Sequence, residues 1–270
     1  MGATRPPAVA GVFYPADPAR LRDRVDGLLG VAAPPQAPPP AALVVPHAGY
    51  RYSGPVAATA YAHLSATRPG VARVTVIGPA HFVLFAGLAL PGTDAFAGPL
   101  GTVPVDHESE DLLRQLAGVH DLPEAHAREH SIEVQLPFLQ RVLGPFTAVF
   151  VALGRSHPEQ VAAVVDVALD RPDGLVVVSS DLSHYHDAAT ARRLDAATAG
   201  AIESLRPEDL APDAACGQAG IAGLLLAAGR RRLRATRLDL RNSADTAGSV
   251  DRVVGYGAWT FGPGPLSRDR

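Results

Sequence analysis

The sequence contains no lysine, one cysteine and no long apolar run, and each shortage excludes a class of protein. Because all 24 basic residues are arginines, catalysis through a lysine Schiff base is excluded. A single cysteine, Cys216, cannot form an intrachain disulfide, which is typical of cytosolic proteins. No run approaches the roughly 18 apolar residues that a membrane-spanning helix requires, and the first residues lack a signal-peptide core. We therefore expect a soluble, cytoplasmic chain.

Neither positive nor negative charge is in clear excess. The net charge is −3, and 19% of the residues are charged against 47% that are hydrophobic, a composition typical of a globular protein. The one dense basic run, residues 230–234, lies where a helix should end, and the helix dipole favours arginines there. A polyanion site is the alternative for this run, but a basic surface across the domain is missing. We expect neither a nucleic-acid nor a membrane partner.

The chain length suits one domain over residues 1–270. Its first 40 residues are predicted to form an irregular arm, a helix and a connector. The helix should begin at Asp17-Pro18, because a capping side chain followed by proline is a common helix start. Residues 33–40 are rich in proline and indicate an extended polyproline connector.

Three short apolar segments end in histidine-containing turns. Each is too short for a helix and too apolar for a half-exposed strand, which indicates buried parallel strands. Segments 43–45, 73–79 and 174–180 lead into His47, His81 and the pair Asp181 and His184, respectively. Open α/β sheets place their ligands beyond the carboxyl ends of the strands. We therefore expect these side chains to meet at one edge of a sheet.

Helical and strand patterns alternate along the rest of the chain. They predict an α/β fold with a mainly parallel central sheet and helices on both faces. A helix over 130–143, kinked at Pro137, should follow a polar loop over 118–129. Other helices are expected over 53–64, 106–116, 158–169, 188–205 and 221–229, strands over 82–91, 147–153, 235–240 and 252–261, and a short hairpin within 92–102.

The common cofactor and hydrolase motifs are absent, including GxGxxG, the P-loop, CxxC, HExxH and GxSxG. His47 and His81 are therefore the strongest candidates for chemistry. Two imidazoles with open positions beside them suit iron, copper or zinc. The alternative is a pair of hydrogen-bonded loop histidines without a metal.

Cys216 directly precedes an apolar helix. The helix dipole and free N–H groups should lower the pKa of its thiol and favour a thiolate that binds metals or attacks electrophiles. The alternative is a small buried apolar residue.

Two further pairs are candidates for acid–base work. Asp181 and His184 share one turn, as an oriented acid–base pair or as support for a ligand, with a capping aspartate as the alternative. His130 and Glu133 are three residues apart and should share a helix face. The remaining histidines are expected to be structural or at the surface: His63, His107, His120, His126, His157 and His186.

The order of these motifs resembles that of the Memo family, whose bacterial and archaeal members are protein B of the AmmeMemoRadiSam system. The resemblance spans nearly the whole chain, and it rests on AGVFYP at 10–15, PHAGYRYSG at 46–54, GPAH at 78–81, EHSIEVQLPFL at 129–139, SSDLSHY at 179–185 and CG at 216–217. The family's fold is similar to that of class III extradiol dioxygenases, which use non-haem Fe(II) and O₂ to cleave catechol-type rings.

Position by position, the resemblance implies the metal ligands His47, His81 and Cys216. Asp181 and His184 would line the pocket, and His130 with Glu133 would lie nearby; these four are the residues for which the resemblance implies catalytic roles. A thiolate stands where extradiol enzymes have a carboxylate ligand. Fe(II) is the metal that the resemblance implies, and two histidines with one cysteine also suit Cu(I) or Zn(II).

The function expected from this resemblance is that of an Fe(II) dioxygenase-like oxidoreductase acting on a small aromatic or phenolic substrate. His184 and His130 would move the substrate's protons. Two alternatives stay open: a copper- or iron-binding protein without turnover, and a scaffold that binds peptides in the same cleft. The resemblance also implies a radical-SAM protein of the same system as a partner.

Overall fold

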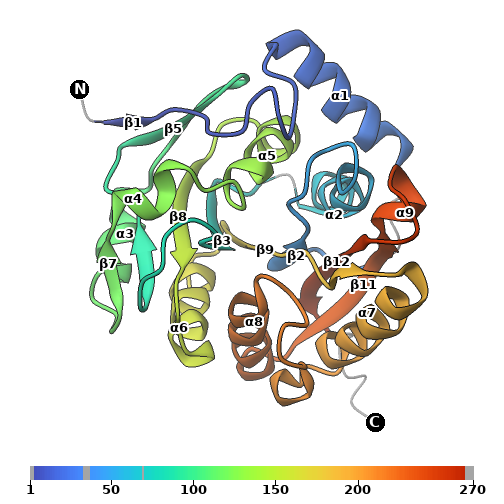
Figure 1. Cartoon of the computed structure of the whole chain (residues 1–270). Helices are drawn as coiled ribbons and strands as arrows, with labels where there is room; N and C mark the ends of the chain where they lie inside the picture. The colour runs from blue at the N-terminus through green and yellow to red at the C-terminus, as the bar shows by residue number, and fades with distance from the viewer. Residues whose placement is uncertain (1–2, 33–36, 69, 265–270) are drawn as a thin grey trace.

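In the residues that this computed structural model describes, 3–32, 37–68 and 70–264, a nine-stranded sheet lies between two layers of helices (Figure 1). Its central strands are parallel and adjacent, in the order β2 (Ala42–Val45), β9 (Gly174–Ser179), β3 (Arg73–Pro79) and β8 (Thr147–Leu153). The predicted α/β class, with a parallel sheet at its centre and helices on both faces, is confirmed.

Further strands extend the sheet on both sides. Beyond β2 lie β12 (Val253–Pro263), β10 (His184–His186) and β11 (Leu233–Asn242), and beyond β8 lie β4 (Leu88–Leu90) and β7 (Val119–Asp121). All of them join through antiparallel pairs except for β4 and β7, which are parallel to each other. A separate small sheet contains β1 (Thr4–Arg5), β5 (Ala95–Gly98) and β6 (Gly101–Pro104). The hairpin predicted within 92–102 is the pair β5–β6.

Helices cover both faces of the central sheet (Figure 1). One apolar core contains side chains of α1 (Pro18–Val31), α2 (Gly54–Thr67) and α5 (Leu136–Leu143). A second core contains those of α6 (Pro158–Leu169), α7 (Ala188–Glu203) and α8 (Gln218–Arg230). The shorter elements are α3 (His107–Leu113), α4 (Pro123–Ala127), η1 (Glu133–Gln135), η2 (Pro207–Asp209) and α9 (Ser243–Thr246). Among the described residues, no helix is both long and apolar enough to cross a bilayer.

Strand β2 shows why its sequence is apolar throughout. Successive side chains of a strand face opposite sides of the sheet. Leu43 and Val45 contact the core of α1, α2 and α5, whereas Ala42 and Val44 contact the other core. All four are fully buried, which is typical of a parallel strand covered on both faces.

The helix predicted over 130–143 begins later than expected. Glu133–Gln135 form the 3₁₀ turn η1, and α5 starts at Leu136 with Pro137 in its first turn. A proline there lacks only an N–H that has no partner inside the helix, so it does not bend the helix. The predicted kink is therefore wrong.

Two other predictions are corrected. The stretch 118–129 is not a loop, because it contains β7 and α4. Of the strand predicted over 82–91, only β4 forms. The chain turns at Gly87, whose φ is +89° and where a Cβ would lie 2.3 Å from the carbonyl oxygen of Gly118. By contrast, α1 begins after Asp17 as predicted, and residues 33–36 of the predicted connector lie outside the described residues.

Candidate metal centre

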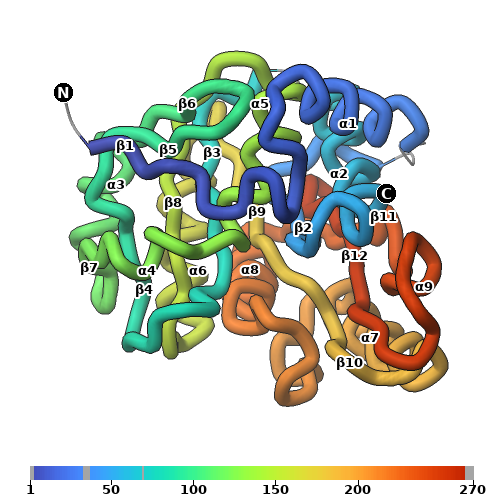
Figure 2. The backbone as a smooth tube through the Cα atoms, turned by 45° about the horizontal axis from the view of Figure 1, so that its top comes forward, coloured from blue at the N-terminus to red at the C-terminus, as the bar shows by residue number. Residues whose placement is uncertain are grey.

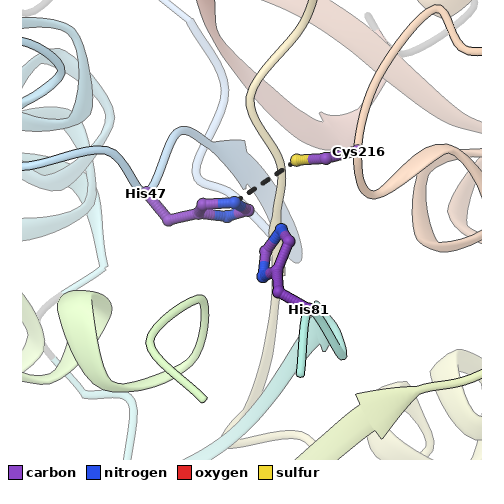
Figure 3. Close-up of side chains that lie close together, drawn as sticks. All are labelled: His47, His81 and Cys216. Atoms are coloured by element: carbon purple, nitrogen blue, oxygen red, sulfur yellow. Dashed lines mark hydrogen bonds between the residues drawn. The ribbon is translucent and has the colours of Figure 1, made fainter. Parts of the chain in front are cut away.

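The candidate metal centre lies at the edge of the sheet where the parallel strands β2, β9 and β3 end. His47 follows β2, His81 follows β3, and Cys216 lies just before α8. Because β9 pairs with both β2 and β3, the two turns that carry the histidines are held on either side of its end. Figure 3 shows the three side chains pointing toward one another. We call them the His/His/Cys group.

The ligand atoms of this group are close enough to share one cation. One nitrogen of each histidine and the Cys216 sulfur all lie within 4.8 Å of one another. His47 Nε2 is 3.3 Å from Cys216 Sγ, and the two imidazole centroids are 5.3 Å apart. A tetrahedral ion with bond lengths of about 2.0–2.3 Å separates its ligand atoms by about 3.5 Å. The donor set and its spacing therefore fit a metal ion.

His47 is held through both its backbone and its ring. Its N–H donates to Asp181 Oδ1 over 2.7 Å, and its Nδ1 lies 2.8 Å from Ser179 Oγ. Burial lowers the pKa of His47 far below its usual value, and the neighbouring His130 and His81 lower it further. The imidazole is therefore neutral, which is the form that binds a metal.

His81 is held by a buried carboxylate, Glu129. The ring Nδ1 lies 2.9 Å from Glu129 Oε1, and the His81 N–H donates to Oε2 over 2.5 Å. Glu129 also accepts from the N–H groups of His130 and Ser131. Burial raises the pKa of Glu129, but these hydrogen bonds outweigh it and lower the pKa to about 2. Because an ionised Glu129 can only accept, the His81 ring carries its proton on Nδ1, and Nε2 is left free for a metal.

The turn that carries Cys216 packs closely on the end of β9. A Cβ at Gly217 would lie 2.8 Å from the Ser179 carbonyl oxygen and 2.8 Å from Ser180 Cβ, so only glycine fits. The Asp181 N–H donates to Cys216 Sγ over 3.2 Å. Burial, together with the charge of Asp181, raises the pKa of the thiol to about 12. The predicted lowering of this pKa is wrong, because the effect of burial outweighs that of the helix N-terminus. A bound cation is therefore needed to form the thiolate.

His130 lies against the same group. Its ring stacks on that of His81, with centroids 4.6 Å apart, and contacts Phe13 of the N-terminal arm at 4.7 Å and Phe82 at 6.0 Å. Burial lowers the pKa of His130 to about 4, so the ring is a neutral proton acceptor. His81, Glu129 and His130 form a second set whose ligand atoms lie within 4.8 Å.

Asp181 and His184 have different partners. The Asp181 carboxylate supports the turn that carries His47, and burial raises its pKa to about 7. The His184 Nδ1 lies 2.7 Å from the Leu182 carbonyl oxygen, so this nitrogen carries the proton and Nε2 is free. Burial lowers the pKa of His184. Asp181 therefore supports a ligand, and His184 is the candidate base of this turn.

The Glu133 side chain contacts the N-terminal arm, residues 3–17, and not the His/His/Cys group. Its carboxylate accepts hydrogen bonds from the Arg5 guanidinium, the Tyr14 hydroxyl and the N–H groups of Ala8 and Val9. Both oxygens of Glu133 are therefore occupied by the arm, which is a structural role, and its catalytic role stays a prediction.

The site combines predicted and unpredicted residues. His47, His81 and Cys216 meet as expected, with His130 and His184 beside them, and their roles stay predictions. Pattern analysis missed the supporting residues Glu129, Ser179 and Gln135. The only signal was their position inside the motifs 129–139 and 179–185. Of the other histidines, His63 and His126 are buried, and His107, His120, His157 and His186 are exposed.

Comparison with known proteins identifies relatives along nearly the whole chain. Residues 5–260 match the family described as Memo-like protein. A MEMO1 family protein of Methanopyrus kandleri is 38% identical, with 95% of this chain and 98% of that protein aligned. Those of Sulfolobus acidocaldarius and Aquifex aeolicus are 36% and 34% identical, aligned over 96% and 93% of this chain and 99% and 97% of their own lengths.

Proposed function

The chain belongs to the Memo family, and from that premise we propose that the His/His/Cys group binds a redox metal in an oxidoreductase for small phenolic substrates. The observation that carries the proposal is the convergence of two imidazoles and one sulfur at the carboxyl ends of the parallel strands. Two nitrogens and one sulfur leave open positions on most metal ions.

Fe(II) is the metal that we propose for this site, bound by His47, His81 and Cys216. Bound there, Fe(II) supplies the redox chemistry by which O₂ is activated. Zn(II) also fits this donor set. The thiolate is what separates the site from the carboxylate-containing sites that favour Fe(II) most strongly.

The chain's own residues can accept the protons of a phenolic substrate. His130 and His184 are both kept neutral by burial and lie beside the His/His/Cys group. The free atom of His184 is Nε2, whereas Nδ1 of His130 is buried and lies 3.4 Å from Glu129 Oε1, so a substrate cannot reach it. His184 can therefore take a proton, through Nε2, from a hydroxyl group that approaches the metal, and His130 stays a candidate only through its other ring nitrogen.

The surroundings of the site favour an aromatic substrate. Phe82, beside His130, is 49% exposed, and Tyr185, beside His184, is 65% exposed. The guanidinium groups of Arg128 and Arg252 lie 4.9 and 5.1 Å from the centres of these two rings. Exposed aromatic rings beside a metal centre offer flat surfaces on which another ring can pack.

A second candidate function is copper binding without turnover. It is favoured by Cys216, because a soft thiolate ligand selects Cu(I). Stoichiometric copper uptake without O₂ consumption would separate this function from the first.

The test is anaerobic metal analysis of the purified protein and three variants. We expect about one iron per chain, lost in Cys216→Ala and His81→Ala and kept in His157→Ala, which changes an exposed histidine. O₂ uptake with a panel of catechols then tests turnover. Copper in place of iron supports the second function. Failure of the wild-type protein to bind any metal, even after anaerobic Fe(II) loading, contradicts the proposal.

A further inference from the structure

The hydroxyl group of Ser179, the last residue of β9, lies beside a metal ligand and a buried amide. We infer that Ser179 and Gln135 are positioning residues: they hold His47 in the tautomer that carries its proton on Nδ1, so that the Nε2 lone pair faces the metal site. The inference goes beyond the proposed function, because it concerns the state of His47 before any metal binds. It follows from the donors and acceptors of one buried network.

The first step fixes the orientation of the Gln135 amide. Its Oε1 accepts a hydrogen bond of 2.9 Å from the Tyr61 hydroxyl, and its Nε2 donates to the Pro46 carbonyl oxygen over 3.0 Å. The reversed amide would place Oε1 against that carbonyl oxygen, and neither atom carries a hydrogen. Gln135 and Tyr61 are both fully buried, so water cannot substitute. The amide nitrogen therefore faces Ser179.

The second step fixes the hydroxyl proton of Ser179. Its Oγ lies 2.6 Å from the Ser131 carbonyl oxygen, which can only accept, so the hydroxyl donates to it. A hydroxyl has one proton and two lone pairs. The lone pairs must then accept from the two other neighbours, Gln135 Nε2 at 2.8 Å and His47 Nδ1 at 2.8 Å.

The third step follows for His47. Because Ser179 has no second proton to give, Nδ1 of His47 must carry its own. A neutral imidazole has one N–H, so Nε2 carries a lone pair, and this is the atom 3.3 Å from Cys216 Sγ. Without Ser179 the ring can exchange between two tautomers, and in one of them a proton occupies the ligand position.

The experiment measures the tautomer directly, by long-range ¹H–¹⁵N NMR of the histidine rings in metal-free protein, with His47→Gln to assign the signals. We expect Nδ1–H in the wild-type protein and a mixture of tautomers in Ser179→Ala. Zn(II) affinity, measured by competition with a chelator, should fall about 10- to 100-fold in Ser179→Ala. Ser179→Thr, which keeps a hydroxyl, should restore both.

The matched control is Ser183→Ala. Ser183 lies in the same turn and is 3% exposed, but within the described residues its hydroxyl has no hydrogen-bond partner. This variant should keep the wild-type tautomer and affinity. Tyr61→Phe removes the hydrogen bond that orients the Gln135 amide but leaves the Ser179 hydroxyl in place. Its effect should therefore lie between those of Ser179→Ala and Ser183→Ala.

Nε2–H in the wild-type protein overturns the inference, and so does an unchanged tautomer in Ser179→Ala. Equal losses of affinity in Ser179→Ala and Ser183→Ala also overturn it, because they indicate general destabilisation. A wild-type protein with Nδ1–H that binds no metal supports the inference on the tautomer and contradicts the proposed function instead. The two can therefore fail separately.

Discussion

Single residues decide how the two histidine ligands are held, and the two supports differ in charge. His81 is supported by a carboxylate, Glu129, that keeps its charge although it is buried, because several N–H groups point at it. The ring of His47 is supported by the uncharged hydroxyl group of Ser179. A charged acceptor forms the stronger hydrogen bond, so the orientation of the His81 ring should be the more firmly fixed of the two.

Another buried histidine makes the fold sensitive to acid. Burial lowers the pKa of His126 from 6.5 to about 4, because protonation would place a charge in the apolar interior. Between these values the unfolded chain binds a proton that the folded chain does not, so stability falls as the pH falls. At about 1.4 kcal/mol for each unit of pKa, this residue costs about 3 kcal/mol near pH 4.

Exchanging this residue should remove that loss. We expect His126→Gln to lose less stability than the wild-type protein between pH 6.5 and 4, measured by urea unfolding across this range. The control is His186→Gln, which changes an exposed histidine and should follow the wild-type curve. An identical pH dependence in all three proteins would contradict the assignment.

Among the elements, the N-terminal arm is hydrogen-bonded to the segment that carries Glu129 and His130. Figure 2 shows the arm, in dark blue, running from β1 beside β5 toward α1. The Arg5 guanidinium pairs with Glu133 and donates to the carbonyl oxygens of His126 and Glu129. The side chains of Arg5 and Glu133 are 4% and 2% exposed, so this ion pair is fully desolvated. The arm therefore belongs to the folded core of the site.

Breaking this buried pair should be costly. We expect Arg5→Met to destabilise the protein by about 3–5 kcal/mol, because it leaves the Glu133 charge buried without its partner. The control is Arg141→Met, which removes the partly exposed pair with Asp26 and should cost about 1 kcal/mol or less. Denaturant unfolding measures both. Similar losses in the two variants would show that the arm pair is no more important than a surface pair.

The elements also show what the sequence can predict. β3, β8 and α6 have the predicted bounds, because apolar strands and a proline-initiated helix are local patterns. The helix predicted from residue 130 does not begin there, and the first helical turn is η1 at Glu133. There the backbone N–H groups of His130 and Ser131 bond the Glu129 carboxylate, and this contact belongs to the folded site. Local propensity does not contain it.

For the whole molecule, the sequence predicted which side chains converge but not what supports them. His47, His81 and Cys216 were singled out by their positions after strands or before a helix, and their role as metal ligands, which the resemblance to the Memo family implies, stays a prediction. Glu129 and Ser179 support histidines that are 48 and 132 residues away along the chain. Those contacts depend on β9 lying between β2 and β3, and strand order is not encoded in local patterns.

Metal binding should stabilise the whole fold, because the unfolded chain does not assemble the site. At a free metal concentration 100-fold above Kd, the gain is about 2.7 kcal/mol. Calorimetry with and without metal should show a higher Tm for the loaded protein, reversed by a chelator. Cys216→Ala should show no such rise. An equal rise in this variant would indicate metal binding elsewhere.

The spacing of the ligands also sets when the site can exist. Cys216 lies 169 residues after His47, and β9 must be present before the two histidine turns can be held side by side. During synthesis, His47 and His81 therefore leave the ribosome long before their third ligand. The nascent chain can offer only two loose imidazoles, which discriminate poorly among metals. All three side chains can therefore meet on one ion only after residue 216 has been synthesised.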